Sequence, residues 1–342
     1  MRSDTVSGAG AQALIASLQK QIDEVLRPLL KGETRVALLD FPNHANVGDS
    51  AIWLGEVAGL RALGVAPLCY TCDYDTYCAP ELRERIGDGI ILLHGGGNLG
   101  DLWPEHQDFR EKVIRDFPGQ RIIQLPQSIC FRDPENLARS RELFNHHAGL
   151  TLLLRDRRSW EFAREHFAAP AFLCPDMAFC LDTLVRPFPA DGEIVWLART
   201  DQESSTPDAA CQGAGIRRVD WLEEPVTELM ELNWLLSSRL NEDRDGRNWL
   251  RDAVSLTYDP LARERLERGC HLLGTGRAVI TDRLHGHILC ILLGIEHVIL
   301  DNSYGKLSSF YDTWTRPCSL GKWCNSAAEA VRCATAWQGE SR

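Results

Sequence analysis

Apolar and polar residues alternate along this chain in blocks that predict strands followed by helices. Short apolar runs bounded by polar or glycine-containing turns are typical of buried strands. Longer stretches whose apolar residues recur every three to four positions are typical of helices with one buried face. Strands are predicted at residues 35–39, 66–71, 89–94, 121–125, 150–154, 194–198, 277–280 and 297–300. Helices are predicted at residues 50–63, 105–117, 135–146, 157–167, 261–273, 288–293 and 306–314.

This order of elements predicts the fold class. Strand–helix repeats favour an α/β fold with a parallel, doubly wound sheet. The chain has 342 residues, too many for one typical core and enough for two domains. Residues 181–192 contain two prolines and a DG turn, so we place the boundary there. We expect two Rossmann-like domains, 1–185 and 186–342, facing one another across a cleft.

Two parts of the chain give weaker signals. Residues 221–240 and 245–256 contain Trp and Leu at roughly helical spacing without a clear assignment. The N-terminal segment predicts an amphipathic helix, because its apolar residues share one face. These residues are Leu14, Ile15, Leu18, Ile22, Val25 and Leu26. We expect this helix to pack against the first domain, and contact with a membrane surface is the alternative.

Composition excludes several classes of protein. The net charge is −11 and no run of basic residues occurs, so no nucleic acid partner is expected. No apolar stretch is long enough to span a membrane, and the N-terminus lacks the apolar core of a secretory signal. We therefore expect a cytoplasmic protein whose twelve cysteines are reduced. Cys69, Cys72 and Cys78 cluster, but no fourth ligand follows at a familiar spacing, so neither a metal nor a cofactor is predicted.

The segment from Thr281 to His287, TDRLHGH, is the strongest candidate for chemistry. It lies where a predicted strand is followed by a predicted helix, the edge at which α/β sheets bind ligands. Arg283 can bind a carboxylate or phosphate through two hydrogen bonds. His285 and His287 can move a proton near neutral pH. A polar turn with a solvated Arg is the alternative.

Other predicted strands also end in polar loops. In NHANVGDSAI, residues 43–52, Asp49 or Ser50 could cap a helix, but the loop holds more polar groups than a cap needs. In HGGGNLGD, residues 94–101, three glycines let the backbone approach a ligand, or form a plain tight turn. Arg155 precedes a predicted helix, where the helix dipole disfavours a cation, so it indicates an anion to bind or pairing with Asp156.

Taken together, these loops resemble those of the polysaccharide pyruvyl transferase family. The resemblance covers residues 35–315 and keeps the order of the family's motifs. The matching segments are NHANVGDSAIW (43–53), LLHGGGNLGDLW (92–103), QLPQSICF (124–131), LRDRRSW (154–160), PDMAF (175–179), LARTDQES (197–204), TDRLHGHILCILLGI (281–295) and DNSYGKLSSFYDTW (301–314). The family's fold is similar to the two-domain glycosyltransferase arrangement called GT-B.

The resemblance implies transfer of the pyruvate unit of phosphoenolpyruvate onto a sugar of an exopolysaccharide or cell-surface glycan precursor, which forms a ketal. The donor would be bound mainly on the C-terminal side, by Arg283, Leu284, His285 and Lys306, together with Arg155 of the N-terminal side. For Lys306, contact with the acceptor and a solvated side chain are the alternatives. His285 would act as general acid or base or stabilise the phosphate, with His287 second. The acceptor, which could be lipid-linked, would lie on the N-terminal side near Asn46, Gly48, Asp49, Gly95, Gly96, Gly97 and Asn98. Asp49 is a candidate base, so the predicted catalytic residues are His285, Arg283 and Asp49.

Other interpretations stay open on the sequence. A nucleotide-sugar glycosyltransferase of the GT-B type would share the architecture and the anion-binding loops. A non-catalytic scaffold is the third, although Arg155, Arg283 and His285 are intact. Arg199, Asp201 and Glu203 match a family segment, and we expect them to pair structurally near the cleft. Trp221, Trp234 and Trp249 favour buried packing over stacking on a sugar.

Overall fold

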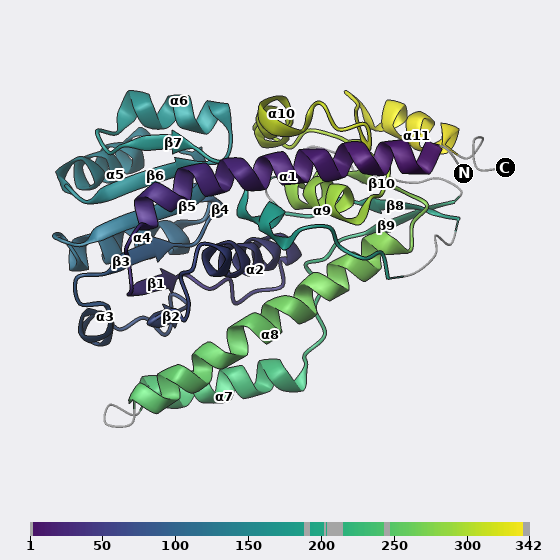
Figure 1. Cartoon of the computed structure of the whole chain (residues 1–342). Helices are drawn as coiled ribbons and strands as arrows, with labels where there is room; N and C mark the ends of the chain where they lie inside the picture. The colour runs from purple at the N-terminus through teal and green to yellow at the C-terminus, as the bar shows by residue number, and fades with distance from the viewer. Residues whose placement is uncertain (1–2, 188–191, 202, 204–214, 243–246, 338–342) are drawn as a thin grey trace.

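Two parallel sheets, one in each half of the sequence, organise the chain (Figure 1). The computed structural model describes residues 3–187, 192–201, 203, 215–242 and 247–337. Within these residues the first sheet has the order β2-β1-β3-β5-β6-β7, with β4 paired to β5. The second has the order β12-β11-β10-β8-β9. The predicted α/β fold with parallel sheets is therefore confirmed.

The central strands of the first sheet are apolar because helices cover both of their faces. Every residue of β1 and β3 is buried, and Val36 lies opposite Ile90 in register. The strands are β1 (Val36–Leu39), β2 (Tyr70–Cys72), β3 (Ile90–Leu93), β4 (Gly96–Gly100), β5 (Arg121–Cys130), β6 (Leu150–Leu154) and β7 (Ala171–Leu173). The helices between them are α2 (Val47–Ala62), α3 (Ala79–Ile86), α4 (Pro104–Asp116), α5 (Pro134–His146) and α6 (Arg157–His166). A 3-10 helix, η1 (Met177–Leu181), follows β7.

The second sheet is also covered by helices, and one of them, α9 (Leu284–Leu293), is wholly buried. Gly294 ends this helix in the left-handed conformation. The strands are β8 (Ile194–Leu197), β9 (Ile216–Val219), β10 (Ala278–Thr281), β11 (His297–Ile299) and β12 (Gly321–Trp323). The remaining elements here are α10 (Lys306–Phe310), the π-helical turn η3 (Tyr311–Thr315) and α11 (Ala327–Ala336).

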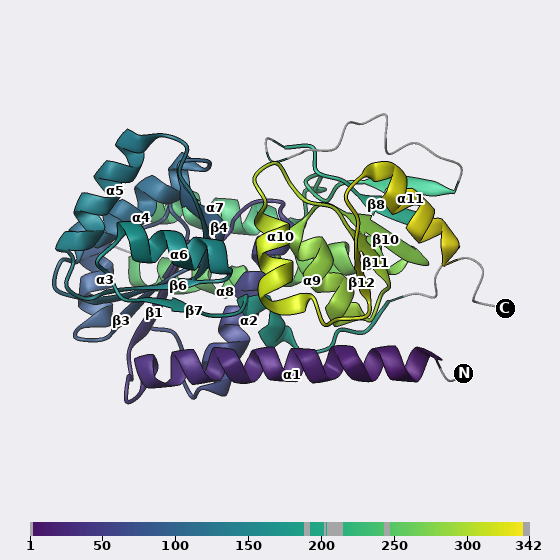
Figure 2. The same ribbon diagram turned by 90° about the horizontal axis from the view of Figure 1, so that it is seen from above.

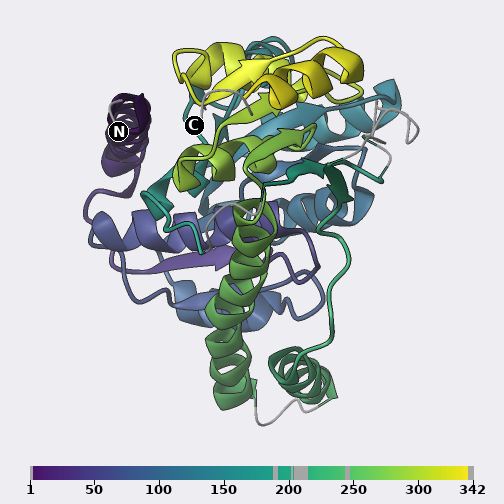
Figure 3. The ribbon, with the colours of Figure 1, turned by 90° about the vertical axis from the view of Figure 1, so that its right-hand side faces the viewer.

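A helical hairpin from the second half of the sequence packs on the first sheet's helices. It consists of α7 (Glu228–Glu242) and α8 (Arg247–Gly274) and extends away from both sheets (Figure 3). Trp53 of α2 donates to Asp259 of α8 over 2.9 Å. Gly269 of α8 lies so close to Val47 that an added Cβ would be 2.3 Å from its Cγ1. The helix predicted at 261–273 is therefore the last part of a much longer one.

The N-terminal helix α1 (Ser3–Leu30) runs alongside both halves of the molecule (Figure 2). Gln19 donates to the carbonyl of Phe179, and α1 also contacts α9. Near its end, Arg121 of β5 donates to the carbonyl of Leu29. The expected packing of α1 against the first half is therefore confirmed, and the helix also contacts α9 of the second half. Its apolar face is buried in the protein, at Ile15, Leu18, Ile22 and Leu26.

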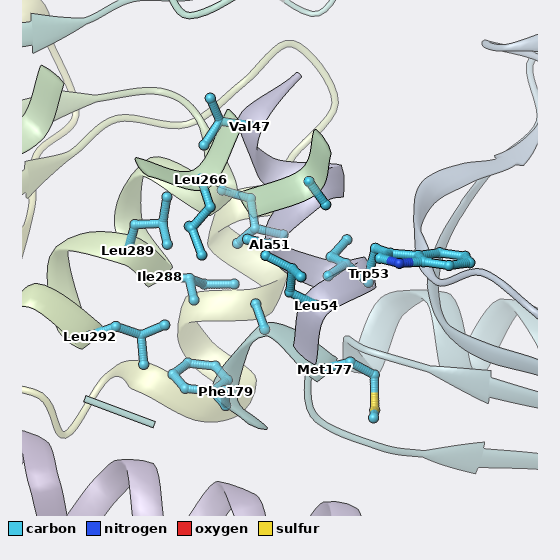
Figure 4. Packing of buried hydrophobic residues seen from close by; sticks show 14 of the residues in the cluster. Val47, Ala51, Trp53, Leu54, Met177, Phe179, Leu266, Ile288, Leu289 and Leu292 are labelled. Atoms are coloured by element: carbon cyan, nitrogen blue, oxygen red, sulfur yellow. The ribbon is translucent and has the colours of Figure 1, made fainter. Parts of the chain in front are cut away.

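One hydrophobic core joins the two halves (Figure 4). Val47 and Leu54 of α2 lie in the same cluster as Ile288 and Leu292 of α9, with Leu266 of α8. Because α8 and α9 of the second half pack on α2 of the first, this core is shared. The boundary predicted near residue 185 stays a prediction, and residues 188–191 lie outside those described. Among the described residues, no helix has both the length and the apolar character needed to cross a membrane.

Most predicted elements are confirmed, with differences at the ends of strands. The segment Gly96–Gly100 forms β4, where a turn was predicted, and Gly100 approaches Cys130 so closely that an added Cβ would lie 1.9 Å from its carbonyl oxygen. β5 continues to Cys130, where its last residues pair with β4, and its register against β6 shifts between Gln124 and Gln127, around Pro126. Helix α9 begins at Leu284, earlier than predicted. Helix α3 and the strands β7, β9 and β12 were not predicted.

Candidate functional site

The carboxyl ends of strands from both sheets surround one cavity of about 480 Å³. Parallel strands place these ends at a common edge, so the loops after β1, β3 and β6 meet those after β8 and β10. From the first half the lining comprises His44, Asn46, Asp49, Gly97, Asn98, Trp103, His106 and Arg155. From the second it comprises Arg199, Asp201, Glu203, Trp221, Leu222, Arg283, Leu284, His285 and Lys306. All five residues predicted to bind the donor therefore line this cavity.

Arg155 and His285, from opposite halves, meet on one buried carboxylate. Arg155 Nη1 donates to Asp176 Oδ2 over 2.7 Å, and His285 Nε2 lies 3.3 Å from the same oxygen. Burial opposes ionisation of Asp176, but His285 and Arg155 outweigh it and hold its pKa well below the usual range. Asp176 thus fixes both groups and orients the His285 ring. Asp176 belongs to the segment PDMAF that resembles the family, but no role was predicted for it.

The other cations are held by acidic side chains of the second half. Arg283 Nη2 donates to Asp220 over 2.7 Å, and its Nη1 lies 3.5 Å from Asp201. Arg199 forms two hydrogen bonds with Asp201, at 2.8 and 2.9 Å. The guanidinium of Arg283 also lies 5.7 Å from the centre of the Trp221 ring. These ion pairs hold the guanidinium groups in place but do not use all of their N–H donors.

Glu203 connects these cations with the first half of the molecule. It accepts from Lys306 Nζ over 2.8 Å and lies 3.0 Å from Arg199 Nη1. Trp103, in the loop after β4, donates to its other oxygen over 3.4 Å. Burial opposes ionisation of Glu203, but Lys306 and Arg199 outweigh it and lower its pKa to about 2. The structural pairing expected for Arg199, Asp201 and Glu203 is confirmed, and it lies in the cavity wall.

The N-terminus of α2 enters the cavity beside His285. Asn46 caps the helix by accepting from the Gly48 backbone over 3.1 Å, and its amide donates to Asp49 over 2.8 Å. An added Cβ on Gly48 would lie 2.4 Å from His285 Nδ1. Glycine is therefore required for this approach between the two halves. The prediction that Asp49 or Ser50 caps the helix is wrong, because Asn46 is the cap; Asn46 and Asp49 also line the cavity.

The glycine-rich segment lies beside the cations. An added Cβ on Gly97 would be 2.8 Å from Arg155 Nη2 and 3.1 Å from Lys306 Nζ. Gly95 is buried behind the residues that line the cavity, and its N–H donates to Glu56 over 2.7 Å. Of the four residues 95–98, Gly97 and Asn98 line the cavity, and Gly95 and Gly96 do not.

Some predicted residues lie elsewhere, and some in the cavity were missed. His287 points into the core, where it bonds His297 over 2.6 Å and Thr315 over 2.7 Å. The expected burial of the tryptophans holds for Trp221, whereas Trp234 and Trp249 are 49% and 64% exposed on α7 and α8. Four further residues line the cavity that were not predicted, because nothing in the local sequence marks them as neighbours of TDRLHGH: His44, Trp103, His106 and Leu222. Among the described residues, no group of three or more His, Cys, Asp or Glu side chains is placed to hold a metal ion.

Comparison with known proteins identifies the family. The family model described as polysaccharide pyruvyl transferase matches residues 46–304, which include all of the cavity lining except His44 and Lys306. Pyruvyl transferase 1 of Schizosaccharomyces pombe is 34% identical over 301 residues, 84% of this chain and 72% of that protein. EpsO of Bacillus subtilis, provisionally named as a pyruvyl transferase, is 30% identical over 306 residues, 87% of this chain and 90% of that protein.

A solved structure shares the fold. It is that of a functionally uncharacterised protein from Klebsiella pneumoniae, with a TM-score of 0.57 and 20% sequence identity. The match covers 89% of this chain and 99% of the Klebsiella chain. With the family model matched over most of its length, the chain belongs to the polysaccharide pyruvyl transferase family.

Proposed function

We propose that the protein transfers the pyruvate unit of phosphoenolpyruvate to a sugar of a polysaccharide or its precursor, forming a cyclic ketal with two hydroxyls. The observation that carries the proposal is the convergence of Arg155, Arg283 and Lys306 with His285 on one cavity between the two sheets. The names of the relatives from Schizosaccharomyces pombe and Bacillus subtilis point to pyruvyl transfer. We further propose that the two halves form a GT-B-like pair of domains divided near residue 185.

The chemistry of this reaction matches the side chains that are present. The donor carries a carboxylate and a phosphate, for which three cations of the cavity are suitable partners. Its methylene carbon must be protonated so that C2 becomes electrophilic. His285, held by Asp176, is our candidate for this acid or for stabilising the departing phosphate. Leu284 N–H, at the start of α9, offers a backbone donor near the positive end of the helix dipole.

The position of Gly97 refines the expected division between donor and acceptor. Its closeness to Arg155 and Lys306 favours a place beside the donor, so we assign Gly97 to the donor side and keep Asn46, Asp49 and Asn98 for the acceptor. Gly48 acts by leaving space for His285, and Gly95 and Gly96 support the wall from behind.

Calorimetric titration with phosphoenolpyruvate tests the proposal. We expect saturable binding by the wild type and at least a tenfold loss in Arg283→Ala, since a charge-assisted pair is worth about 1.5–3 kcal/mol. Arg239→Ala, on the exposed part of α7, is the matched control and should bind as the wild type does. Unfolding temperatures of all three proteins show whether a loss of binding is a loss of fold.

The same titration separates pyruvyl transfer from nucleotide-sugar glycosyl transfer. UDP and GDP are titrated in parallel, because a glycosyltransferase of this architecture would bind the nucleotide of its donor. Binding of phosphoenolpyruvate but of neither nucleotide is the expected result. Tight binding of UDP or GDP with none of phosphoenolpyruvate would overturn the proposal in favour of the glycosyltransferase.

A further inference from the structure

A second Asp–His pair lies on the wall of the cavity that the first half contributes. His106, in the first turn of α4, has Nδ1 at 3.0 Å from both carboxylate oxygens of Asp40. Asp40 follows β1 directly and is 2% exposed. Its φ of 74° is in the left-handed region, where a residue other than glycine is strained. The backbone therefore turns sharply after β1 and aims this carboxylate at the His106 ring.

This contact determines which nitrogen of His106 can react. The carboxylate of Asp40 requires a proton on Nδ1, which leaves Nε2, on the opposite edge of the ring, with its lone pair in the neutral form. His106 lines the cavity with its side chain 13% exposed. In the part of the chain that the structure describes, Nε2 forms no hydrogen bond with another group. It is thus a proton acceptor within the same cavity as Arg155, Arg283 and His285.

The surroundings of His106 favour its basicity. Burial opposes protonation of His106, but Asp40 outweighs it and the net effect raises the pKa of the imidazole. The groups that face it are Asp40, Asp49, Arg110, the ring of His44 at 5.9 Å and the ring of Tyr74 at 5.5 Å. Of these, Asp40 alone bonds it directly.

Asp49 is a weaker base in this setting. Burial opposes its ionisation, but His44 and His285 outweigh it and lower the pKa of Asp49. Its Oδ2 also accepts from Asn46 over 2.8 Å. A carboxylate stabilised in this way takes up a proton less readily than an imidazole whose pKa is raised. The structure therefore favours His106 over the Asp49 that the sequence suggested.

We propose that His106, held by Asp40, is the general base that removes the proton from the attacking sugar hydroxyl; this rests on the pyruvyl transfer proposed above. The hydroxyl oxygen bonds to C2 of the donor, its proton moves to His106 Nε2, and C3 gains a proton from the acid. The bond from C2 to the phosphate oxygen then breaks, and the second hydroxyl bonds to C2. Of the two hydroxyl protons, one ends on the new methyl group and the other leaves with the phosphate.

The test uses two variants and a matched control. His106→Gln removes the base, and Asp40→Asn removes only the charge of its partner, since Asn also tolerates the left-handed backbone. His146→Gln makes the same change at an exposed site at the end of α5. Phosphate release from phosphoenolpyruvate is measured with a panel of methyl glycosides, and phosphoenolpyruvate binding by calorimetry. The ring protons of His106 are titrated by NMR in the wild type and Asp40→Asn.

We expect His106→Gln to lower kcat by ~10²–10⁴-fold while the Kd for phosphoenolpyruvate stays within about twofold, as for loss of a general base. Asp40→Asn should lower the pKa of His106 in the NMR titration. The acidic limb of the pH–rate profile of Asp40→Asn should move to lower pH together with the pKa of His106, because the base then stays neutral down to a lower pH. His146→Gln should match the wild type.

Each other outcome contradicts a stated part of the inference. Full kcat in His106→Gln would overturn the role as base while leaving pyruvyl transfer intact. An unchanged His106 titration in Asp40→Asn would overturn the role of Asp40, whether or not a glycoside in the panel is an acceptor. A wild type that neither binds phosphoenolpyruvate nor releases phosphate from it would instead refute the proposed function, and this inference with it.

Discussion

Single glycines set the geometry of the cavity, because the absence of a side chain lets groups from the two halves come close together. Gly48 has no side chain where the ring of His285 lies, and Gly97 has none where Arg155 and Lys306 approach. His285 is thus fixed on two sides, by Asp176 through a hydrogen bond and by Gly48 through van der Waals contact. Small residues at such closest approaches decide whether groups from two halves of a chain can meet.

Gly48→Ala should therefore impair the reaction far more than it impairs folding. The new Cβ would lie 2.4 Å from His285 Nδ1, so the ring must move. A displacement of this size costs up to about 100-fold in rate when catalysis depends on position. We expect a fall in kcat with a smaller change in the Kd for phosphoenolpyruvate.

The control for this experiment is Gly119→Ala, whose added Cβ would meet no atom within 4 Å. It should match the wild type in kcat and in unfolding temperature. Unchanged kcat in Gly48→Ala would show that His285 does not need its position in this structure.

At the scale of elements, α2 connects the site to the core. Its first turn forms part of the cavity, and its next turns carry Ala51 and Leu54 into the core shared with α8 and α9. Asn46 has two functions at this point, because it caps the helix and holds Asp49. The two functions can be separated by substitution.

Asn46→Ala should lower the free energy of unfolding by about 1 kcal/mol, the usual cost of losing an N-cap. Asn46→Ser should keep most of that stability, because Ser is also a good cap, but its short side chain has no amide to donate to Asp49. Chemical denaturation measures the first effect and steady-state kinetics the second. Equal stability of the Ala and Ser variants would argue against a capping role, and wild-type kcat in Asn46→Ser against a need for the contact with Asp49.

The elements also show how far sequence patterns could predict the fold. Strands β1 and β3 are continuous apolar runs, and their positions follow from the sequence because buried parallel strands need such runs. β4 could not be predicted, since glycine has low strand propensity, and Gly96 and Gly100 pair with β5 because close backbone approach is possible there. The hairpin of α7 and α8 gave a weak pattern because Leu232, Trp234 and Leu235 are exposed and blur the helical period.

At the scale of the whole molecule, buried histidines make stability depend on pH. His297 donates Nδ1–H to the carbonyl of Ile295 and accepts from His287, and both rings are buried. Burial lowers the pKa of His297 to about 4 and that of His287 well below its usual value. The folded protein therefore holds both rings neutral, whereas the unfolded chain protonates them below pH ~6.5.

This contribution to stability should be complete above pH ~6.5 and should be lost as the pH falls toward about 4. In the double variant His287→Leu and His297→Leu, the protein should lose less stability over the same fall in pH. Unfolding temperatures at pH 7.5 and pH 5 measure the difference between the two proteins. His94 and His106, whose raised pKa values act in the opposite direction, are present in both and cancel. An equal fall in both proteins would contradict the prediction.

The class of fold and the importance of Arg155, Arg283 and His285 could be predicted from the sequence, because strand periodicity and residues next to strand ends are local properties of a chain. Lys306 was indicated by the family resemblance. The side chains that hold these residues became known from the three-dimensional packing of the chain. Asp176 meets His285 across 109 positions, and Asp40 meets His106 across 66. The first pair arises from the packing of the two halves, and the second from the packing of α4 beside β1 within the first half. No local pattern in the sequence records which distant residues such packing brings together.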